Sequence, residues 1–344
     1  MTDVTVRVPG RVNLIGEHLD YNGGHVLPAA LSIGIDVTLT PHSDDRVTIT
    51  SGAFAERANR RLADSATGDW SDAALGAVRQ AVALGLLSGG ADIAIASTIP
   101  PGAGLSSSAA LIVAVLKAAK TCAGADLSDI AIARAARGVE NEFLSVPCGI
   151  MDQMAVAIAE PNEALLLNTA TLDYRTVQLV PDHDIVVLHS GVSRRLSDGR
   201  YAKRRTECVA AQNALGSTDL CHADLAVIER LADPAQRRRA RHCAAEQVRV
   251  LSAVAAIEAG DAHELGALMV QSHASMRDLF DISLPAIDAL VADACSLGAA
   301  GARLTGGGFG GCIVALVERR RREDWLRALM ARHPDAQFVA AIAP

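Results

Sequence analysis

The sequence lacks several features that mark specialised classes of protein. Only 3% of its 344 residues are aromatic, so its core has to be built mainly from Ala, Val, Leu and Ile. No apolar run reaches the roughly 18 residues that a membrane-spanning helix requires, and the N-terminus lacks the apolar segment of an export signal. We therefore expect a cytoplasmic protein with no membrane partner.

Patterned cysteines and an excess of basic residues are missing as well. The seven cysteines are scattered, odd in number and without a Cys-x-x-Cys pair, which favours reduced thiols over disulfides or a zinc site. The formal net charge is −7, so the chain lacks the basic field that a nucleic-acid surface needs. Its arginine-rich runs lie in Ala- and Leu-rich contexts, and we interpret them as solvated helix faces: 204–205, 237–239 and 319–322.

The length fits two domains better than one, and half of the residues are apolar. Alternating strands and Ala-rich helices predict a mixed α/β chain, with domains 1–170 and 171–344. The expected helices are 71–87, 107–122, 128–144, 150–160, 198–215, 223–231, 234–259, 262–271 and 285–298. The expected strands are 4–8, 26–40, 46–50, 92–98, 163–169 and 176–190, with a turn at 181–182, and two more around a glycine stretch at 306–311.

The stretch GRVNLIGEHLDYNGG at 10–24 gathers polar side chains around an apolar thread. We expect its aliphatic residues to face the core: Val12, Leu14, Ile15 and Leu19. Asn13 is interpreted as an amide that braces the loop, and residues 21–24 as the turn that returns the chain to the sheet. These assignments leave a dense group of polar side chains whose purpose the stretch alone does not give: Arg11, Glu17, His18 and Asp20.

The stretch PPGAGLSSSAA at 100–110 combines glycines, serines and the start of a helix. Gly102 and Gly104 allow a close backbone approach, and the unpaired N–H groups at the helix start attract an anion. The hydroxyls of residues 106–108 also suit a divalent cation. No Gly-Lys-Ser/Thr follows, so this is not a Walker A loop. A phosphate loop and a plain strand-to-helix turn capped by serine both stay open at this point.

The stretch GGGFGG at 306–311 contains a formal Gly-x-Gly-x-x-Gly pattern. A dinucleotide-binding loop needs a helix after it, whereas the residues that follow here, CIVALV, predict a strand. We therefore reject a dinucleotide site. The stretch is either a flexible β-turn or a backbone wall against the phosphate or sugar of a ligand.

Two carboxylates flank a predicted break in the chain. Glu140 ends one helical segment, Asp152 begins the next, and the Pro-Cys-Gly turn at 147–149 lets both enter one pocket. The helix dipole favours the ionised form of Asp152. Taken singly, the two acids are also explained as a surface charge and an ordinary first-turn helix acid.

These stretches together resemble a known superfamily, the galactokinase, homoserine kinase, mevalonate kinase and phosphomevalonate kinase (GHMP) superfamily. GRVNLIGEHLDYNGGHVLP, PPGAGLSSSAAL and GARLTGGGFGGC are similar to its three motifs, and the first, with CGIMDQ at 148–153, resembles galactokinases. The resemblance implies a two-domain α/β fold, with a mixed-sheet N-terminal domain, a ferredoxin-like C-terminal domain and the active site between them. It also implies phosphorylation of a sugar at its anomeric hydroxyl with ATP and Mg²⁺.

The resemblance implies roles for individual residues. Asp152 matches the catalytic aspartate, and Arg11 the arginine that faces it. Sugar-binding positions are matched by Glu17, His18, Asp20, Gly149 and Tyr201. Magnesium-site positions are matched by Ser108 and Glu140. Nucleotide-binding positions are matched by Pro101, Gly102, Ala103, Gly104, Leu105, Ser106, Ser107, Ser108, Gly307 and Gly308, and by Trp70, although residues 71–73 depart from the Asn-Tyr pair usual after it.

Other departures from the family pattern fall on the sugar side. Leu19 stands where galactokinases usually carry Thr, and Ser145 where Gly is common. Galactose is therefore the expected substrate, with N-acetylgalactosamine and arabinose as alternatives. A non-catalytic sensor of sugar and ATP is a second class of hypothesis, but such relatives lack residues of the serine loop, which is complete here. The sequence leaves the oligomeric state open, and we expect a monomer.

Overall fold

The structure is a computed structural model that describes residues 3–160, 162–192 and 199–343. Its contacts divide the chain into two compact units, neither of which is one continuous segment. The first unit comprises residues 1–11, 32–101 and 106–158, and the second comprises residues 12–31, 102–105 and 159–344. The sequence predicted two domains that meet near residue 170. That boundary stays a prediction, because the two contact units are not continuous segments.

A mixed sheet forms the framework of the first unit. Its strands are β1 (Val4–Asn13), β3 (Pro28–Pro41), β6 (Ala91–Ser97), β4 (Arg46–Ser51) and β5 (Ala58–Arg61). Strand β3 pairs with β1 and is antiparallel to β6, β6 is parallel to β4, and β5 is antiparallel to β4. Val37, Leu39 and Ile93 are buried between more exposed neighbours. This is the two-residue period of strands with one face in the core.

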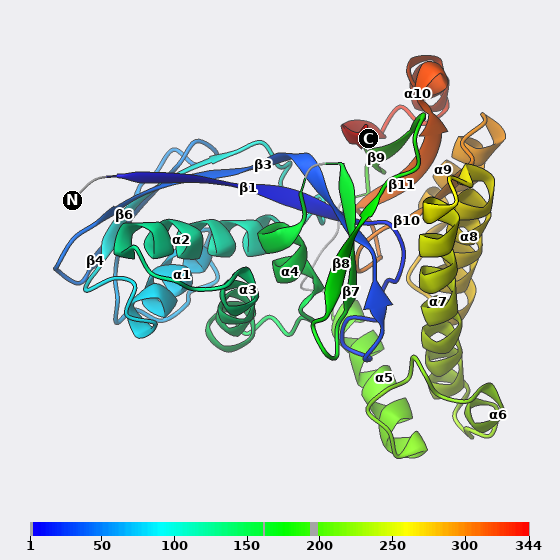
Figure 1. The fold of residues 1–344 in the computed structure, drawn as a ribbon, viewed down its shortest axis with the longest axis horizontal. Coiled ribbons are helices and arrows are strands. Elements are labelled where there is room, and N and C mark those ends of the chain that lie inside the picture. Colours follow the sequence, from blue (N-terminus) through cyan, green and yellow to red (C-terminus); the bar gives the residue numbers. More distant parts are fainter. Residues whose placement is uncertain (1–2, 161, 193–198, 344) are drawn as a thin grey trace. The chain divides into compact units, whose positions relative to one another are not determined.

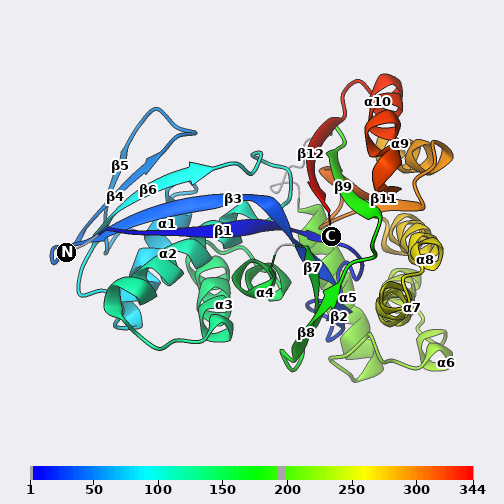
Figure 2. The ribbon, with the colours of Figure 1, turned by 45° about the horizontal axis from the view of Figure 1, so that its top comes forward.

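Helices cover one face of this sheet (Figures 1 and 2). They are α1 (Asp72–Ala83), α2 (Ser107–Ala123), α3 (Asp129–Gly138) and α4 (Met151–Ile158). Ten of the 17 residues of α2 are buried, which is typical of a helix with apolar residues nearly all round. Helix α3 begins after Ser128, whose hydroxyl accepts the N–H of Ala131 at 3.2 Å, so the predicted N-cap is confirmed.

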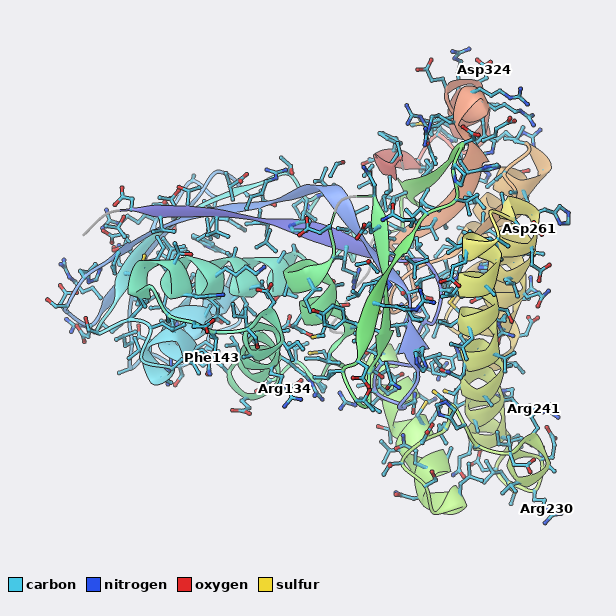
Figure 3. All side chains as sticks on the ribbon, in the orientation of Figure 1. Arg134, Phe143, Arg230, Arg241, Asp261 and Asp324 are labelled. Atoms are coloured by element: carbon cyan, nitrogen blue, oxygen red, sulfur yellow. The ribbon has the colours of Figure 1, made fainter. Side chains whose placement is uncertain are left out.

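A π-helical turn, η1 (Val139–Phe143), continues α3 and carries Glu140. Gly76 of α1 makes room for this turn, because a Cβ there would lie 2.6 Å from both Val139 and Phe143. Figure 3 labels Phe143, whose ring lies 5.0 Å from the guanidinium of Arg79. The helix expected at 128–144 is therefore an α-helix followed by a π turn, a feature that often occurs at functional sites.

The second unit contains a four-stranded antiparallel sheet. Its order is β10 (Gly301–Leu304), β11 (Cys312–Glu318), β9 (His183–His189) and β12 (Gln337–Ile342). The central strand β11 is buried along its first six residues, which explains why its sequence is continuously apolar. A smaller ladder places β2 (His25–Val26) and β8 (Tyr174–Gln178) on either side of β7 (Glu163–Asn168).

The remaining helices belong to the second unit. They are α5 (Arg200–Leu215), α6 (Leu225–Ile228), α7 (Pro234–Glu258), α8 (Ala262–Ser275), η3 (Met276–Phe280), α9 (Pro285–Ser296), η4 (Arg319–Arg321) and α10 (Arg322–Arg332). Helices α7 and α8 lie side by side in both views (Figures 1 and 2). Asp233 caps α7 directly before a proline, and Asp261 caps α8, so each start follows a standard sequence signal.

Two of the arginine-rich runs are partly buried, which corrects their interpretation as solvated faces. Arg204 of α5 is 7% exposed and Arg239 of α7 is 1% exposed. Both form ion pairs with Glu207, and Arg204 also pairs with Asp281. A charged side chain is buried only where such a partner meets it. A run of charges along the sequence does not reveal that partner.

The mixed α/β class is confirmed, and most expected elements are present. Strand β5, helix α10 and strand β12 were missed, because the first two are rich in polar residues and the third is short and partly exposed. The strand region at 176–190 is divided at the predicted turn into β8 and β9. Residue 198, the expected start of the helix that forms α5, lies outside the described residues. No helix in the described ranges is both long and apolar enough to cross a membrane.

Candidate active site

Asp152 lies in the first turn of α4, and Arg11 lies on β1, both in the first unit. Arg11 donates from Nε to Oδ1 of Asp152 and from a terminal nitrogen to Oδ2, both at 2.8 Å. Arg11 is 5% exposed, so this bidentate pair fixes the plane of the carboxylate where water screens it little. The hydroxyl of Ser106 donates to the same Oδ2 at 2.6 Å. Gly149 is buried in the turn just before α4.

Glu140 lies on the π turn and is 8% exposed. Its carboxylate accepts a hydrogen bond from the side chain of Gln153, and the thiol of Cys148 lies 3.7 Å from Oε2. The hydroxyl of Ser108 is close enough to lower the pKa of Glu140. Burial raises the pKa of Glu140, and the nearby charge of Asp152 raises it further. Among the described residues, the side chains with the largest effect on the pKa of Glu140 include no cation.

The surroundings of Glu140 are suited to a divalent cation. Asp152 is close enough for its charge to disfavour the ionised form of Glu140, and the hydroxyl of Ser108 offers an oxygen near Glu140. Mg²⁺ prefers oxygen ligands and keeps several waters, so a carboxylate and a hydroxyl are typical of the share that a protein contributes. The described part of the chain has no cluster of three His, Cys, Asp or Glu side chains suited to a metal. Nucleotide oxygens would therefore have to complete the coordination.

In the second unit, Glu17 is held by a buried ion pair. Glu17 is 2% exposed, and Arg303 of β10 is 0% exposed. The guanidinium of Arg303 donates to the Glu17 carboxylate and to the C=O of Leu14, the latter at 2.6 Å. The N–H of Gly306 also donates to Oε1 of Glu17, and the hydroxyl of Thr305 lies 3.3 Å from the same atom. Burial raises the pKa of Glu17, although Arg303 opposes that shift. The first and third motifs are thus joined through this carboxylate.

Helices α7 and α8 add a second layer of buried polar groups to the same loop. Glu246 is fully buried, and its Oε1 accepts the N–H of Gly16 at 3.0 Å. Burial alone would raise the pKa of Glu246, but the charges of Arg249 and Arg303 lower it to about 2. His242 places Nε2 3.2 Å from the C=O of Glu17, and burial lowers its pKa to about 4. The loop is therefore held by a charged carboxylate and a neutral imidazole.

His18 and Tyr201 come together in an aromatic cluster of the second unit. The ring of His18 stacks on Phe280 with centroids 4.4 Å apart, and its centroid is 5.4 Å from that of Tyr201. Nδ1 of His18 lies 2.7 Å from the hydroxyl of Tyr21. Burial raises the pKa of Tyr21 well above its usual value, and neighbouring groups that include Asp20 add to the shift. Two of the sugar-binding candidates, His18 and Tyr201, are thus neighbours, and Asp20 lies close enough to affect the pKa of Tyr21.

The glycine stretch packs against the phosphate loop within the second unit. A Cβ on Gly311 would lie 3.4 Å from the C=O of Ala103, and one on Gly306 would lie 3.7 Å from the C=O of Gly104. Gly308 has a φ of +79°, which favours glycine. Gly306 and Gly311 are therefore packed against the phosphate loop. A backbone wall against the phosphate or sugar of a ligand stays a prediction. The remaining candidates of the two segments are Pro101, Gly102, Leu105, Ser107 and Gly307, of which Leu105 is buried and Ser107 exposed.

Trp70 lies in the loop before α1, in the first unit. Its ring stacks on Phe54 with centroids 4.6 Å apart and an interplanar angle of 12°. Residues 71–73, which depart from the family pattern, include a residue that stabilises this loop. Asp72 accepts the N–H groups of Thr67 and Gly68 at 2.8 and 2.7 Å and pairs with Arg60 at 2.9 Å. Asp72 therefore orders the loop that presents Trp70.

The apolar thread of the first motif is in the core, as predicted. Its residues are at most 2% exposed: Val12, Leu14, Ile15 and Leu19. The predicted turn at 21–24 is confirmed by hydrogen bonds from the N–H groups of Asn22 and Gly24 to the C=O of Leu19. The expectation for Asn13 is wrong. Both atoms of its side-chain amide are buried without a partner among the described residues, and only its C=O is bonded, by Thr305.

Family models match most of the motif-bearing chain. The galactokinase galactose-binding signature matches residues 2–41, the N-terminal domain of GHMP kinases residues 72–160, and their C-terminal domain residues 253–335. A galactokinase of Roseiflexus sp. (strain RS-1) is 41% identical over 352 residues, covering 97% of this chain and 88% of the relative. The chain belongs to the galactokinase family. Galactokinases are sugar phosphotransferases of the GHMP kinase family.

Solved structures agree with this placement. The Lactococcus lactis galactokinase, solved in complex with galactose, has a TM-score of 0.93 and 29% identity, covering 99% of this chain and 93% of that one. The Methanococcus jannaschii mevalonate kinase has a TM-score of 0.76 at 18% identity, covers 100% of this chain and 99% of that one, and shows the shared fold alone. The GHMP-kinase fold expected from the sequence is therefore confirmed.

Sequence reasoning missed several residues of the two clusters. Arg303 stands inside an apolar strand of the third motif, and an isolated charge in such a strand is a usable signal for a buried pair. Gln153 directly follows Asp152 and is fully buried, but its donation to Glu140 has no sequence signature. Glu246 and His242 belong to a long helix whose many charges hide the buried ones.

Proposed function

We propose that this chain transfers the γ-phosphoryl group of ATP to the anomeric hydroxyl of D-galactose. The observation that carries the proposal is the bidentate Arg11–Asp152 pair at the start of α4, in which Arg11 is buried and Asp152 is partly exposed. A carboxylate held in one orientation by an arginine suits the positioning of a hydroxyl group for attack.

Phosphoryl transfer proceeds through a loose transition state, so it depends mostly on positioning and charge stabilisation. Asp152 orients the sugar hydroxyl and accepts its proton late, after cleavage of the P–O bond has begun. Full deprotonation beforehand is not needed, and the neighbouring guanidinium makes Asp152 a weak base. Arg11 also offsets charge on the transferring group.

The sugar and the nucleotide have separate sets of proposed contacts. Hydroxyl groups of the sugar are bound by Glu17, His18, Asp20, Gly149 and Tyr201. Phosphate groups are bound by the loop at 101–108 and by Gly307 and Gly308, and the base lies near Trp70. When bound, Mg²⁺ would neutralise charge on the phosphates, and Ser108 and Glu140 are the residues that would hold it. The cytoplasmic location and monomeric state expected from the sequence stay predictions.

A panel of free sugars in a coupled ADP-release assay tests the substrate. Galactose is expected to give the highest kcat/KM among galactose, N-acetylgalactosamine, arabinose and glucose, with homoserine as a control from another branch of the superfamily. A higher kcat/KM for N-acetylgalactosamine or arabinose would move the assignment to that sugar. Binding of galactose and ATP without release of ADP would identify a sensor instead of an enzyme.

Replacing Glu140 with glutamine is expected to raise the Mg²⁺ concentration for half-maximal effect by about tenfold or more. Glutamine keeps the size of Glu140 and one acceptor oxygen, but it removes the charge that would hold the ion. The measurement is a Mg²⁺ titration of the binding of a non-hydrolysable ATP analogue, with turnover as a second readout. Glu142→Gln, an exposed acid on the same π turn, is the control. Equal titration curves for Glu140→Gln and the parent would reject Glu140 as a ligand.

A further inference from the structure

Ser106 contacts the proposed catalytic carboxylate directly. Its hydroxyl donates to Oδ2 of Asp152 at 2.6 Å, and a terminal nitrogen of Arg11 donates to the same atom at 2.8 Å. A serine hydroxyl has one proton to donate. In this arrangement that proton is committed to Asp152, so the side chain of Ser106 does not donate to a phosphate.

The backbone of Ser106 is in a conformation that serine disfavours. Its φ and ψ are 62° and 38°, the left-handed region, where the Cβ of a residue other than glycine lies too close to the backbone. The same loop uses glycine where φ is positive at Gly102 (+71°) and Gly104 (+75°). Ser106 stands just before α2, yet its side chain makes no capping hydrogen bond to that helix. Neither backbone preference nor helix capping accounts for a serine at this position. The remaining feature of the residue is its hydroxyl, which contacts Asp152.

We propose that Ser106 is a positioning residue that acts through Asp152. Arg11 fixes the plane of the carboxylate, and Ser106 adds a third hydrogen bond that keeps the carboxylate from turning about its side-chain torsions. Ser106 also joins the phosphate loop to α2, so its hydrogen bond links the end of that loop to the carboxylate. The proposal rests on the proposed role of Asp152 in the transfer of the phosphoryl group.

Ser106→Gly is the sharpest test, because glycine adopts the left-handed backbone without strain and lacks only the hydroxymethyl group. We expect kcat to fall about 10- to 30-fold, the loss of one hydrogen bond to a charged group. KM for ATP and for galactose should stay within about threefold of the parent values. The melting temperature should stay the same or rise, since glycine relieves strain. A purely structural serine would instead lower kcat and melting temperature together.

Two further variants separate the hydroxyl from the backbone and from its neighbour. Ser106→Ala keeps the strain and removes the hydroxyl, so it should lose kcat to the same extent as Ser106→Gly. Ser107→Ala changes the next serine of the loop, which is exposed and makes no contact with Asp152 that the structure describes. Because Ser107 belongs to the proposed nucleotide contacts, its main expected effect is a higher KM for ATP, whereas Ser106→Gly should act mainly on kcat. This split distinguishes phosphate binding from positioning of Asp152.

The proposal is overturned by a kcat within twofold of the parent for Ser106→Gly, by a loss of kcat that follows a loss of thermal stability, or by a rise in the KM for ATP alone. Asp152→Asn, measured alongside, separates this failure from failure of the proposed function. Normal turnover by Asp152→Asn would remove the catalytic role on which Ser106 depends. An inactive Asp152→Asn with a fully active Ser106→Gly would remove only the role of Ser106.

Discussion

Replacing Asp152 with asparagine is expected to lower kcat about 1,000-fold while leaving the fold intact. Asparagine has nearly the same shape, and its one oxygen can still accept from Arg11 and Ser106 at the position of Oδ2. Its NH2 group, at the position of Oδ1, cannot accept from Nε of Arg11, and the side chain cannot take the proton of the sugar hydroxyl. Positioned proton transfer contributes roughly 10²- to 10⁴-fold to enzymatic rates. Binding of galactose and of ATP should change much less than kcat, because neither depends on late proton capture. The coupled ADP-release assay and equilibrium binding of both ligands measure the two effects.

Asp129→Asn is a matched control for Asp152→Asn. Both residues are first-turn acids of a helix, but Asp129 is partly exposed and pairs only with Lys117 in the described structure. Its removal should leave kcat unchanged. A folded Asp152→Asn protein with a kcat within tenfold of the parent would reject both proposed roles of Asp152, as the base and as the group that orients the sugar hydroxyl.

Replacing Arg303 with methionine is expected to cause the largest loss of stability, about 3–5 kcal/mol. Methionine matches much of the volume of the arginine side chain but leaves the Glu17 carboxylate buried without its cation. It also removes positive charge from beside Glu246, whose pKa Arg303 helps to lower. The measurement is the free energy of unfolding by denaturant, supported by the melting temperature. A decrease of less than about 1 kcal/mol in the free energy of unfolding would contradict a buried ion pair between Arg303 and Glu17.

Two comparisons sharpen the test of Arg303. Arg175 pairs with Glu258 at 2.6 Å on the surface of the same unit, where both side chains are 51% exposed. Arg175→Met should cost less than about 1 kcal/mol, because water screens that pair. The double variant Arg303→Met with Glu17→Gln should be more stable than Arg303→Met alone, since it no longer buries an uncompensated carboxylate at position 17.

Much of the fold follows from local sequence signals. The start of α3 is set by the Ser128 cap, and the starts of α7 and α8 by aspartate caps. Elements with a clear apolar period, such as β6 and α2, were predicted within one or two residues. Strand β5 and helix α10 were missed, because their polar sequences carry little periodic signal and each is formed against a neighbour.

The candidate site divides in the same way. The sequence names Asp152, Glu140 and the serine loop through their residue types, order and resemblance to galactokinases. The hydrogen bond from Ser106 to Asp152 could not be predicted from the sequence. That contact joins side chains 46 positions apart. No local pattern encodes such a distance, because it depends on how α2 and α4 pack.

By itself, the sequence determined that this protein is a mixed α/β galactokinase with glycine- and serine-rich loops and paired acids, since short motifs and apolar periods are local properties. Only the tertiary structure decided which charges are buried and which side chains meet. Arg303 and Glu17 are far apart in the sequence yet share one buried ion pair, whereas Arg175 and Glu258 pair in water. The physical reason is that burial and partnership arise from the packing of distant segments, and both decide what a charge contributes.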